Sequence, residues 1–358
     1  MEKNKNNPDS SEYKMIELDG SYGEGGGQIL RTALALSILT QKPFHIIRIR
    51  HGREKPGLKP QHFHSIKALQ KLTNSEVSNL KMGSEEITFK PKPIKENSLN
   101  IDVGTAGSLT LLLQSLLLPC INSEKDICIK MKGGTDVSWS QPIDHLQYVF
   151  LPLIKEFSDI EFELIQRGYY PKGQGKIKLK IPAKKIIPDE INHIEKGSLK
   201  KIKIISHAHK DLKNSNVAER QLKSCKKMLN SFFYHENINP EIETTTDYQN
   251  TQSIGSGISV IGIYENTRIG SDSLGEKGKK SEIIGKEAAE RLILEIQKDA
   301  VVDKFTADQL IPFMALTKKA KIKTSQITDH ILSNIYTAEK FMDIKFSIEL
   351  KNNIIEKI

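Results

Sequence analysis

Apolar and polar residues follow one another along the chain in an order of elements that recurs. The first unit begins with a strand at 15–20 (MIELDG), a glycine turn, and a helix at 28–40 (QILRTALALSILT) whose apolar residues have helical spacing. The same patterns predict the four elements that follow: a strand at 43–50, a helix around 61–73, and strands at 76–83 and 85–91. The pattern therefore predicts a βαβαββ unit.

A second copy of this unit follows, with strands at 99–104, 126–133, 160–170 and 175–182 and helices at 108–121 and 145–157. A third copy lies near the carboxyl end, with helices at 308–317 and 330–342 and strands at 321–327, 343–350 and 353–358. A period of roughly 80 residues is long for a solenoid but suits a duplicated α+β unit. The sequence thus predicts an α+β fold in which three βαβαββ repeats form one large domain.

Residues 187–300 have a different pattern, in which strands accompany two long helical runs after a Lys/Pro-rich segment, PAKKIIPDE. We interpret this stretch as a smaller α+β domain inserted into the third repeat. The large domain then comprises 14–186 and 301–358. The polar residues 1–13 are expected to form a disordered tail.

The composition favours a polyanionic partner and a reducing compartment. The 358 residues carry 53 Lys and Arg against 44 Asp and Glu, a formal net charge of +9, which attracts polyanions. Three cysteines without a CxxC pair indicate neither a disulfide framework nor a cysteine zinc site. The amino terminus lacks an apolar signal segment, and the most apolar run, 109–121, is too short for a bilayer. We therefore expect a cytoplasmic protein (nuclear if the source is eukaryotic) with no membrane partner; no oligomeric state is predicted.

Two small-residue turns each precede a helix. In GSYGEGGG (20–27) the glycines let the backbone approach a ligand, and the following helix amino terminus offers free N–H groups to an anion. Glu24 would repel a phosphate there unless a divalent cation bridges them, so it is a candidate metal ligand. Arg31 lies one helical turn past Gln28 and is placed to point back to the turn. The second turn, GTAG (104–107), is explained as well by tight packing of a helix on a sheet.

The loop 48–63 (RIRHGREKPGLKPQHF) concentrates positive charge at the end of a predicted core strand. A charge run is usually a solvated face, but here Gly57 and the prolines restrict the loop. Arg50 and Arg53 are therefore predicted to hold a terminal phosphate.

His330 stands where a strand-like run gives way to a helical one, and it is either a capped surface residue or the chemical centre of the protein. Asp308 either caps its helix or, with Gln309, binds a ribose or base on which Phe305 stacks. The remaining histidines considered are expected to be packed or solvated: His62, His64, His207 and His209.

Seven segments resemble the RNA 3′-terminal phosphate cyclase family and run in the family's order from about residue 15 to 347: LDGSYGEGGGQILRTALALS, IRHGREKPGLKPQH, GTAGSLTLLLQ, KGGTD, RGYYPKGQG, DKFTADQL and TDHILSNI. GEGGGQILR followed by KPGLxxQH is not a generic combination. Gln174 in PKGQG departs from the glycine that the family often has. The resemblance implies three repeats interrupted by a small domain.

The resemblance also implies a reaction that converts an RNA 3′-phosphate into a 2′,3′-cyclic phosphodiester with ATP, through a histidine–AMP intermediate and an adenylylated RNA end. The family's nucleophilic histidine corresponds to His330, and an imidazole suits this role because it is nucleophilic when neutral near pH 7. The ligand of the Mg²⁺ or Mn²⁺ ion falls on Glu24. The family's ATP-contacting positions correspond to Gln114, Phe305, Thr306, Ala307, Asp308 and Gln309. The positions near the phosphates of the RNA substrate correspond to Arg31, Arg50, Arg53 and Gln61.

His330 distinguishes the chain from two related classes of protein. Cyclase-like ribosome-biogenesis proteins share the fold but lack the histidine. Enolpyruvate transferases share the repeat architecture but not GEGGGQILR with TDHILSN. A non-catalytic RNA-binding factor in ribosome biogenesis is the alternative function, because the positive net charge suits it equally.

Overall fold

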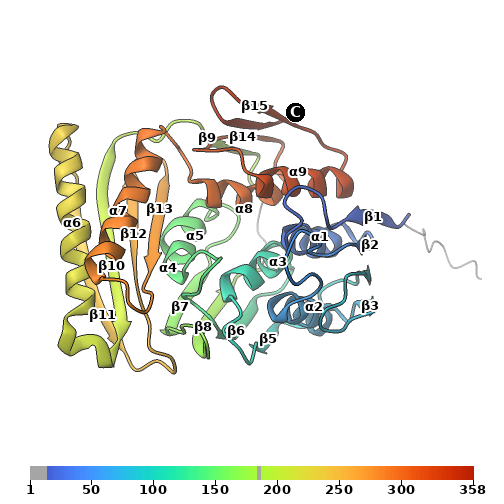
Figure 1. The fold of residues 1–358 in the computed structure, drawn as a ribbon. Helices are drawn as coiled ribbons and strands as arrows, with labels where there is room; N and C mark the ends of the chain where they lie inside the picture. The colour runs from blue at the N-terminus through green and yellow to red at the C-terminus, as the bar shows by residue number, and fades with distance from the viewer. Residues whose placement is uncertain (1–13, 184–186) are drawn as a thin grey trace, which may run out of the picture.

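Three four-stranded sheets of the computed structural model, which describes residues 14–183 and 187–358, share one strand order (Figure 1). The predicted tail, 1–13, lies outside the described residues. The first sheet has the order β1 (Ile16–Asp19), β2 (Phe44–Ile47), β4 (Ile87–Lys90), β3 (Glu76–Ser78). The second has the order β5 (Ser98–Asp102), β6 (Ile127–Gly133), β8 (Gly175–Ile181), β7 (Glu161–Gln166). The third has the order β9 (Glu190–His193), β14 (Lys319–Lys323), β16 (Ile354–Lys357), β15 (Phe346–Glu349).

Strand directions also agree among the three sheets. The first two strands of each sheet are parallel and the other neighbours are antiparallel. A parallel pair needs a crossover, usually a helix. The crossovers are α1 (Gln28–Thr40), α3 (Leu109–Ile121) and, after the insertion, α8 (Lys304–Met314); the helices that follow the second strands include α2 (Pro60–Thr73) and α9 (Asp329–Phe341). The predicted α+β fold class is confirmed, and the common topology supports the three repeats.

The helix predicted at 145–157 is a composite of α4 (Ile143–His145), the π-helical segment η1 (Leu146–Phe150) and α5 (Leu151–Leu153). Pro152 has no N–H to donate to the carbonyl of Tyr148, so a regular helix would leave this oxygen without a backbone partner. The guanidinium of Arg268 donates to it instead, with Nη1 at 3.1 Å. A wider helical turn at this point is a common way to absorb such an interruption.

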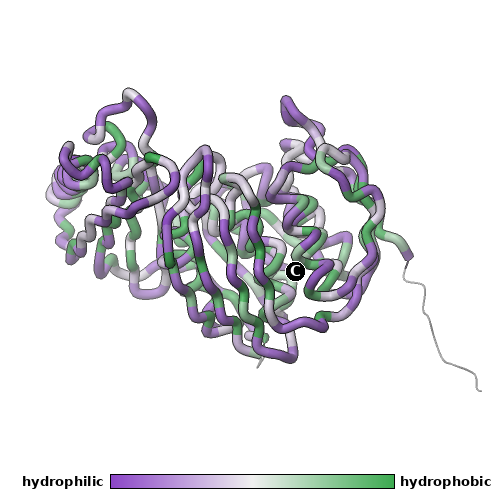
Figure 2. Tube along the Cα trace, turned by 90° about the horizontal axis from the view of Figure 1, so that it is seen from below, coloured by the Kyte–Doolittle hydropathy of each residue, from purple (hydrophilic) through white to green (hydrophobic). Residues whose placement is uncertain are grey.

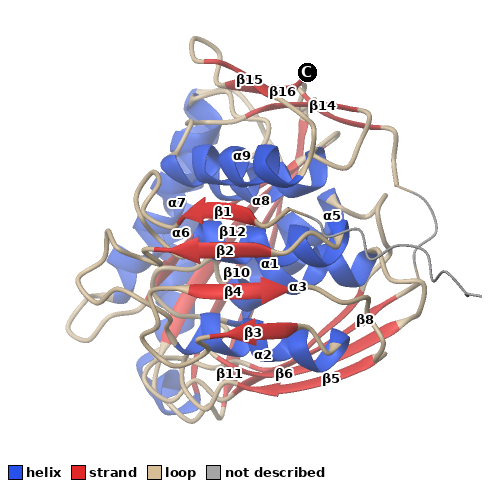
Figure 3. Ribbon diagram, turned by 90° about the vertical axis from the view of Figure 1, so that its right-hand side faces the viewer, coloured by secondary structure: helices blue, strands red, loops and turns tan. Residues whose placement is uncertain are grey.

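Helices lie between the three sheets and share one hydrophobic core with them. α1 packs against both α3 and α9, and α8 packs against α9 (Figure 3). In β8, buried positions alternate with partly or fully exposed ones, as expected for a sheet with one face in the core; the same alternation of hydropathy follows the strands in Figure 2. No helix within the described ranges combines the length and apolar character needed to cross a membrane.

The insert has its own sheet and core. Its strands are β10 (Leu199–His209), β11 (Glu241–Gln249), β12 (Ser256–Tyr264) and β13 (Arg268–Leu274), in the order β11-β10-β12-β13. The long helices α6 (Val217–His235) and α7 (Ser281–Gln297) cover one face and enclose a separate apolar cluster (Figure 1). The other face meets the second repeat, where Ile205 and Ile261 pack against Val149.

The first strand of the third repeat lies inside the stretch predicted as the insert. β9 pairs in parallel with β14, and Ile191 belongs to the core of the large domain. Ala300 belongs to the core of the insert, whereas Val302 belongs to that of the large domain. We therefore propose that the insertion begins after β9, and not at 187, and ends at about residue 300.

Candidate active site

The candidate site lies where the amino ends of α1 and α9 meet. α9 begins at Asp329, and its first turn is fixed by Thr328, whose hydroxyl accepts a hydrogen bond from the Ile331 N–H at 3.3 Å. This cap holds His330 in the first turn of the helix. The glycine turn before α1 supplies Glu24, which faces His330 from the first repeat.

The two nitrogens of His330 have different surroundings. Nε2 lies 2.8 Å from Oε1 of Glu24, whereas Nδ1 is buried without a hydrogen-bond partner, 3.9 Å from Oδ2 of Asp308. The side chain as a whole is 33% exposed. Burial lowers the pKa of His330, and the Glu24 carboxylate opposes this shift in part. The imidazole is therefore mainly neutral at pH 7.

Glu24 also forms an ion pair with Arg53 from the loop after β2. Its turn is crowded: a Cβ at Gly26 would lie 3.2 Å from Nη2 of Arg53, and one at Gly27 would collide with Nε2 of His62. Glycine is therefore required at position 27 to let the ring of His62 lie against the helix amino terminus.

A buried polar chain joins the three repeats beneath the site. Arg31 is 5% exposed and donates from Nε to Oε1 of Gln114 at 2.8 Å and from Nη2 to Gln28. Gln28 in turn donates to Oδ1 of Asn334 on α9 at 3.0 Å. Burial lowers the pKa of Arg31 to about 10, so the guanidinium stays charged at neutral pH. The predicted residues Arg31 and Gln114 are thus together; Gln28 and Asn334 had not been assigned a role in the site.

Asp308 does not cap α8, so that alternative is wrong. The cap is Asp303, whose Oδ1 accepts from the N–H groups of Phe305 at 3.1 Å and Thr306 at 2.8 Å. Asp308 lies one turn further on, buried, with Oδ1 unpartnered. Burial raises its pKa to about 8, although Arg31 acts in the opposite direction.

The other residues of the predicted ATP segment face in different directions. The side chains of Thr306 and Ala307 are fully buried, and the Thr306 hydroxyl donates to Asp303 at 3.0 Å. Phe305 is 38% exposed, and Gln309 is half-buried with its amide donating to the Phe305 carbonyl at 3.0 Å. Phe305 therefore offers the accessible flat surface of this segment.

The basic loop contributes one arginine to the site and uses another for its own structure. β2 ends at Ile47 rather than residue 50, because Arg48 and Arg50 adopt left-handed φ values of 54° and 58°. Nη1 of Arg50 donates to the carbonyls of Lys55 at 2.7 Å and Gly57 at 3.0 Å, which clamps the loop. Arg53 reaches Glu24.

Two further residues of this region occupy the start of α2. Gln61 is half-buried in its first turn. His62 is buried, as the packed alternative predicted; its Nδ1 accepts from the Lys59 N–H at 3.2 Å, and its Nε2 has no partner. Burial, together with Arg31 and Arg50, holds the pKa of His62 well below its ordinary value, so the ring is neutral.

A second cluster of charged groups joins the insert to the second repeat. Arg167 pairs with Asp136 at 3.2 Å and Asp144 at 2.8 Å, and Nε2 of His207 lies 3.5 Å from Asp136. The ligand atoms of Asp136, Asp144 and His207 lie within 4.8 Å of one another. No sequence pattern predicts this cluster, because β10 carries His207 while the carboxylates come from the large domain. Because Arg167 pairs with both carboxylates, we interpret the cluster as an ion-pair network between the second repeat and the insert.

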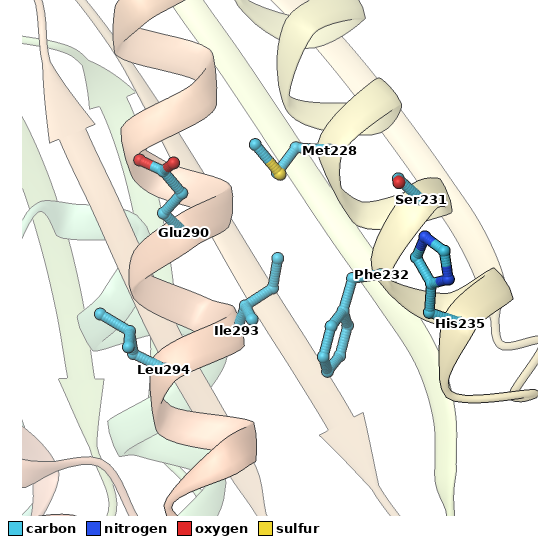
Figure 4. Close-up of a pocket in the computed structure, with 7 residues that line it drawn as sticks. All are labelled: Met228, Ser231, Phe232, His235, Glu290, Ile293 and Leu294. Carbon is cyan, nitrogen blue, oxygen red and sulfur yellow. The ribbon is translucent and has the colours of Figure 1, made fainter.

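A hollow of about 490 Å³ lies between α6 and α7 on the insert (Figure 4). Its walls are mainly apolar and come from Met228, Ser231, Phe232, His235, Glu290, Ile293 and Leu294. All of these residues belong to the insert, whereas His330, Glu24 and Arg31 belong to the repeats. The hollow is therefore not part of the candidate site.

The chain is similar to known proteins over nearly its whole length. Residues 22–348 match the family model described as RNA 3′-terminal phosphate cyclase. The RNA 3′-terminal phosphate cyclase of Pyrococcus furiosus is 42% identical over 348 residues, which cover 96% of this chain and 97% of the relative. That of Sulfurisphaera tokodaii is 44% identical over 336 residues, covering 93% and 96%. That of Archaeoglobus fulgidus is 40% identical over 333 residues, covering 92% and 96%. The chain belongs to the RNA 3′-terminal phosphate cyclase family.

Proposed function

We propose that this protein uses ATP to convert an RNA 3′-phosphate end into a 2′,3′-cyclic phosphodiester, with His330 as the nucleophile. The observation that carries the proposal is the environment of His330: a neutral, partly exposed imidazole whose Nδ1 is buried and whose Nε2 faces Glu24. A solvated capping histidine would need neither the depressed pKa nor a carboxylate partner from another repeat.

In the first step the lone pair of Nε2 attacks the α-phosphorus of ATP. A nitrogen–phosphorus bond forms, the bond from the α-phosphorus to the bridging oxygen breaks, and pyrophosphate leaves. Facing the Glu24 carboxylate, Nε2 carries the proton of the neutral ring. Before the attack this proton has to leave Nε2, and the ring has to hold its proton on Nδ1, beside Oδ2 of Asp308. Arg53 lies beside Glu24 and Arg31 lies below, so both are positioned to offset negative charge on the phosphates.

In the second step an oxygen of the RNA 3′-phosphate attacks the same phosphorus, and the bond to Nε2 breaks, which regenerates His330. In the third step the neighbouring 2′-hydroxyl attacks the activated 3′-phosphorus, loses its proton and expels AMP. This attack is intramolecular and gains a large proximity advantage. The protein's task in the last step is therefore mainly to orient the RNA end.

The donor set near His330 fits a magnesium or manganese ion that is shared with phosphate. Glu24 offers one carboxylate, and within the described residues it belongs to no cluster of three ligands. Mg²⁺ is commonly held by one or two carboxylates together with substrate phosphates and water. Glu24 would hold the ion, whose chemical contribution is to neutralise phosphate charge. Phe305 provides a surface for the adenine, beside the buried carboxyl of Asp308.

The proposal is tested by incubating the protein with α-labelled ATP and Mg²⁺ or Mn²⁺, denaturing it, and measuring label bound to protein. Label from the α-phosphate, none from the γ-phosphate, and loss of the label in acid are expected for a histidine phosphoramidate. Absence of α-label with either metal would favour the alternative, a non-catalytic RNA-binding factor. The relatives described above come from archaea, and we expect the reaction to take place in the cytoplasm.

A further inference from the structure

Two aromatic rings stand in solvent at the edge of the second repeat. Trp139, the single tryptophan of the chain, is 97% exposed, and Tyr170 is 75% exposed. Large aromatic side chains usually bury most of their area, so an indole held almost fully in water indicates a binding role. We propose that Trp139 and Tyr170 form a platform on which bases of the RNA substrate stack, upstream of its 3′-terminal nucleotide.

The two rings come from neighbouring segments. Asp136 and Tyr169 form a parallel bridge, and the N–H groups of Thr135 and Asp136 donate to the Gly168 carbonyl at 3.0 and 3.3 Å. Trp139 follows this bridge on one segment and Tyr170 on the other. Both rings therefore leave the same edge of the second repeat.

Both loops are fixed by contacts to the rest of the protein. Trp139 has a left-handed φ of 67°, which is unfavourable for a residue with a side chain and is maintained by its surroundings. The Ser140 hydroxyl donates to the Val137 carbonyl at 3.1 Å, and Thr110 donates to the Gln141 carbonyl at 2.9 Å.

The loop of Tyr170 is held from the insert. The Tyr169 hydroxyl lies 2.8 Å from Nδ1 of His207, and the Lys172 N–H donates to Ser253 at 3.0 Å. Rings on fixed loops lose little conformational entropy when a base stacks on them. The geometry thus favours a preformed surface over a flexible loop tip.

The platform continues from the candidate active site along α3. Gln114 accepts from Arg31, and Thr110, one turn earlier on the same helix face, holds the Gln141 carbonyl two residues after Trp139. One helical turn spans about 5.4 Å. The topology also supports a position of Trp139 near the candidate active site, because the segment after β6 that carries Trp139 is the counterpart of the arginine loop after β2.

The loop of Tyr170 also lies close to segments that border the candidate active site. A Cβ at Gly173 would lie 2.7 Å from the Ala106 Cα atom in the GTAG turn, and one at Gly107 would lie 3.7 Å from the Gln61 backbone nitrogen. Lys172 is exposed beside Tyr170 and adds positive charge. Aromatic rings with nearby cations are the usual means of binding single strands without sequence preference.

The proposed occupant is RNA and not ATP. ATP has one base, for which Phe305 is already available on α8, whereas two rings on separate segments suit successive bases of a strand. The inference rests on the RNA-end chemistry proposed above. Its test therefore has to separate RNA binding from adenylylation.

Binding can be measured first without catalysis. Because Trp139 is the only tryptophan, fluorescence excited at the red edge of the absorption band, where the nine tyrosines hardly absorb, reports on this position alone. Single-stranded RNA with a 3′-phosphate should quench it saturably in the absence of ATP and metal, and Tyr170→Ala should weaken that binding by about tenfold, the scale of one lost stacking contact. RNA that binds without changing the fluorescence, or quenching by ATP alone at equal strength, would overturn the proposal.

Catalysis gives an independent measurement. Trp139→Ala and Tyr170→Ala should each raise the KM for an oligonucleotide 3′-phosphate by about tenfold while leaving the rate of protein adenylylation unchanged. Neither variant should differ from wild type on a nucleoside 3′-phosphate, which has no upstream base. Tyr234→Ala is the matched control, since Tyr234 is 83% exposed on α6 of the insert. An unchanged KM for the oligonucleotide contradicts the platform. If the wild type is never adenylylated, the proposed function fails and the fluorescence result still decides the platform.

Discussion

Nε2 of His330 lies 2.8 Å from Oε1 of Glu24, although one residue belongs to the third repeat and the other to the first. The pair exists only because α1 and α9 pack side by side. Neither repeat alone could form it, so the chemistry proposed here depends on the packing of the repeats.

Replacing His330 with Asn should abolish AMP attachment to the protein while leaving the fold intact. The side chain is partly exposed, and the Thr328 cap that fixes the helix does not depend on it. Label from α-labelled ATP should fall by at least about 10³-fold, with a melting temperature close to wild type. Asp329→Asn, at the exposed neighbouring position, is the control and should keep its label. An H330N protein that accepts AMP at the wild-type level would refute the assignment.

Glu24→Gln should reduce adenylylation and change its metal requirement. The substitution keeps the shape of the side chain but removes the charge that a cation would need. We expect a loss of about 10²-fold that is partly recovered at high Mg²⁺ or Mn²⁺. The measurement is the initial rate of labelling across a metal titration, and an unaltered titration curve would contradict the metal-ligand role.

Arg50 and Arg53 should respond differently to substitution, although both were predicted to hold a phosphate. Nη1 of Arg50 donates to two carbonyls of its own loop, so Arg50→Ala should lower the free energy of unfolding by about 1–2 kcal/mol. Arg53→Ala should leave stability nearly unchanged and slow the transfer of AMP to RNA more than self-adenylylation. Denaturant unfolding and single-turnover assays separate the two effects; equal losses in both chemical steps would assign Arg53 to ATP instead.

Gly27→Ala should damage the site by displacing His62. A Cβ at this position collides with the imidazole Nε2, and overpacking of this kind costs about 1–3 kcal/mol. The double variant with His62→Ala should recover part of the lost stability, because the obstructing ring is gone. Thermal unfolding of the two single variants and the double variant provides the comparison, and purely additive losses would show that the two residues do not conflict.

The ion pair of His145 and Asp303 should make stability depend on pH. Nε2 of His145 lies 3.2 Å from Oδ2 of Asp303, and both groups are buried. Burial acts to lower the pKa of His145, but the carboxylate raises it above the ordinary 6.5. Burial acts to raise the pKa of Asp303, but His145 and two backbone N–H groups bring it below 3.8.

The stabilisation that His145 contributes is therefore complete below pH 6.5 and is lost as the pH rises through the folded-state pKa of His145. The stabilisation that Asp303 contributes is present above pH 3.8 and is lost as the pH falls through the folded-state pKa of Asp303. His145→Gln keeps a hydrogen-bond donor but cannot titrate. The melting temperatures of wild type and this variant should differ most between about pH 4 and 6.5 and converge in more alkaline buffer. A constant difference across that range would exclude a charged pair.

Most elements of the repeats could be predicted because their apolar residues mark what they bury, which is one face of a strand such as β8 and nearly the whole length of α1. The helix predicted at 28–40 is observed with the same bounds as α1. The strand predicted at 43–50 ends early, since the left-handed conformations of Arg48 and Arg50 leave no mark on the hydrophobic pattern. β9 was assigned to the insert because it is only four residues long and its partner, β14, lies beyond the insert in sequence.

The site was predictable only where a residue type or the family resemblance pointed to chemistry. His330, Glu24 and Arg31, to which the resemblance assigns roles, lie close together, and those roles stay predictions. Gln28 and Asn334 escaped notice because a buried amide pair between two helices depends on how the repeats pack, which no local pattern encodes. The two alternatives for Asp308 could not be separated until Asp303 was seen to cap α8.

The pairing of β9 with β14 also sets the order in which the molecule can be completed during synthesis. Each of the first two sheets has all its strands within one short stretch of chain, and can close as soon as that stretch leaves the ribosome. In the third sheet β9 stays unpaired until the whole insert and β14 have been made. Pairing β9 with β14 closes a long loop of chain, which is entropically costly and slow. α9 follows β14, so His330 is the last of the predicted site residues to be made, and a chain that ends before β14 has the sheets of the first two repeats and of the insert but no nucleophile.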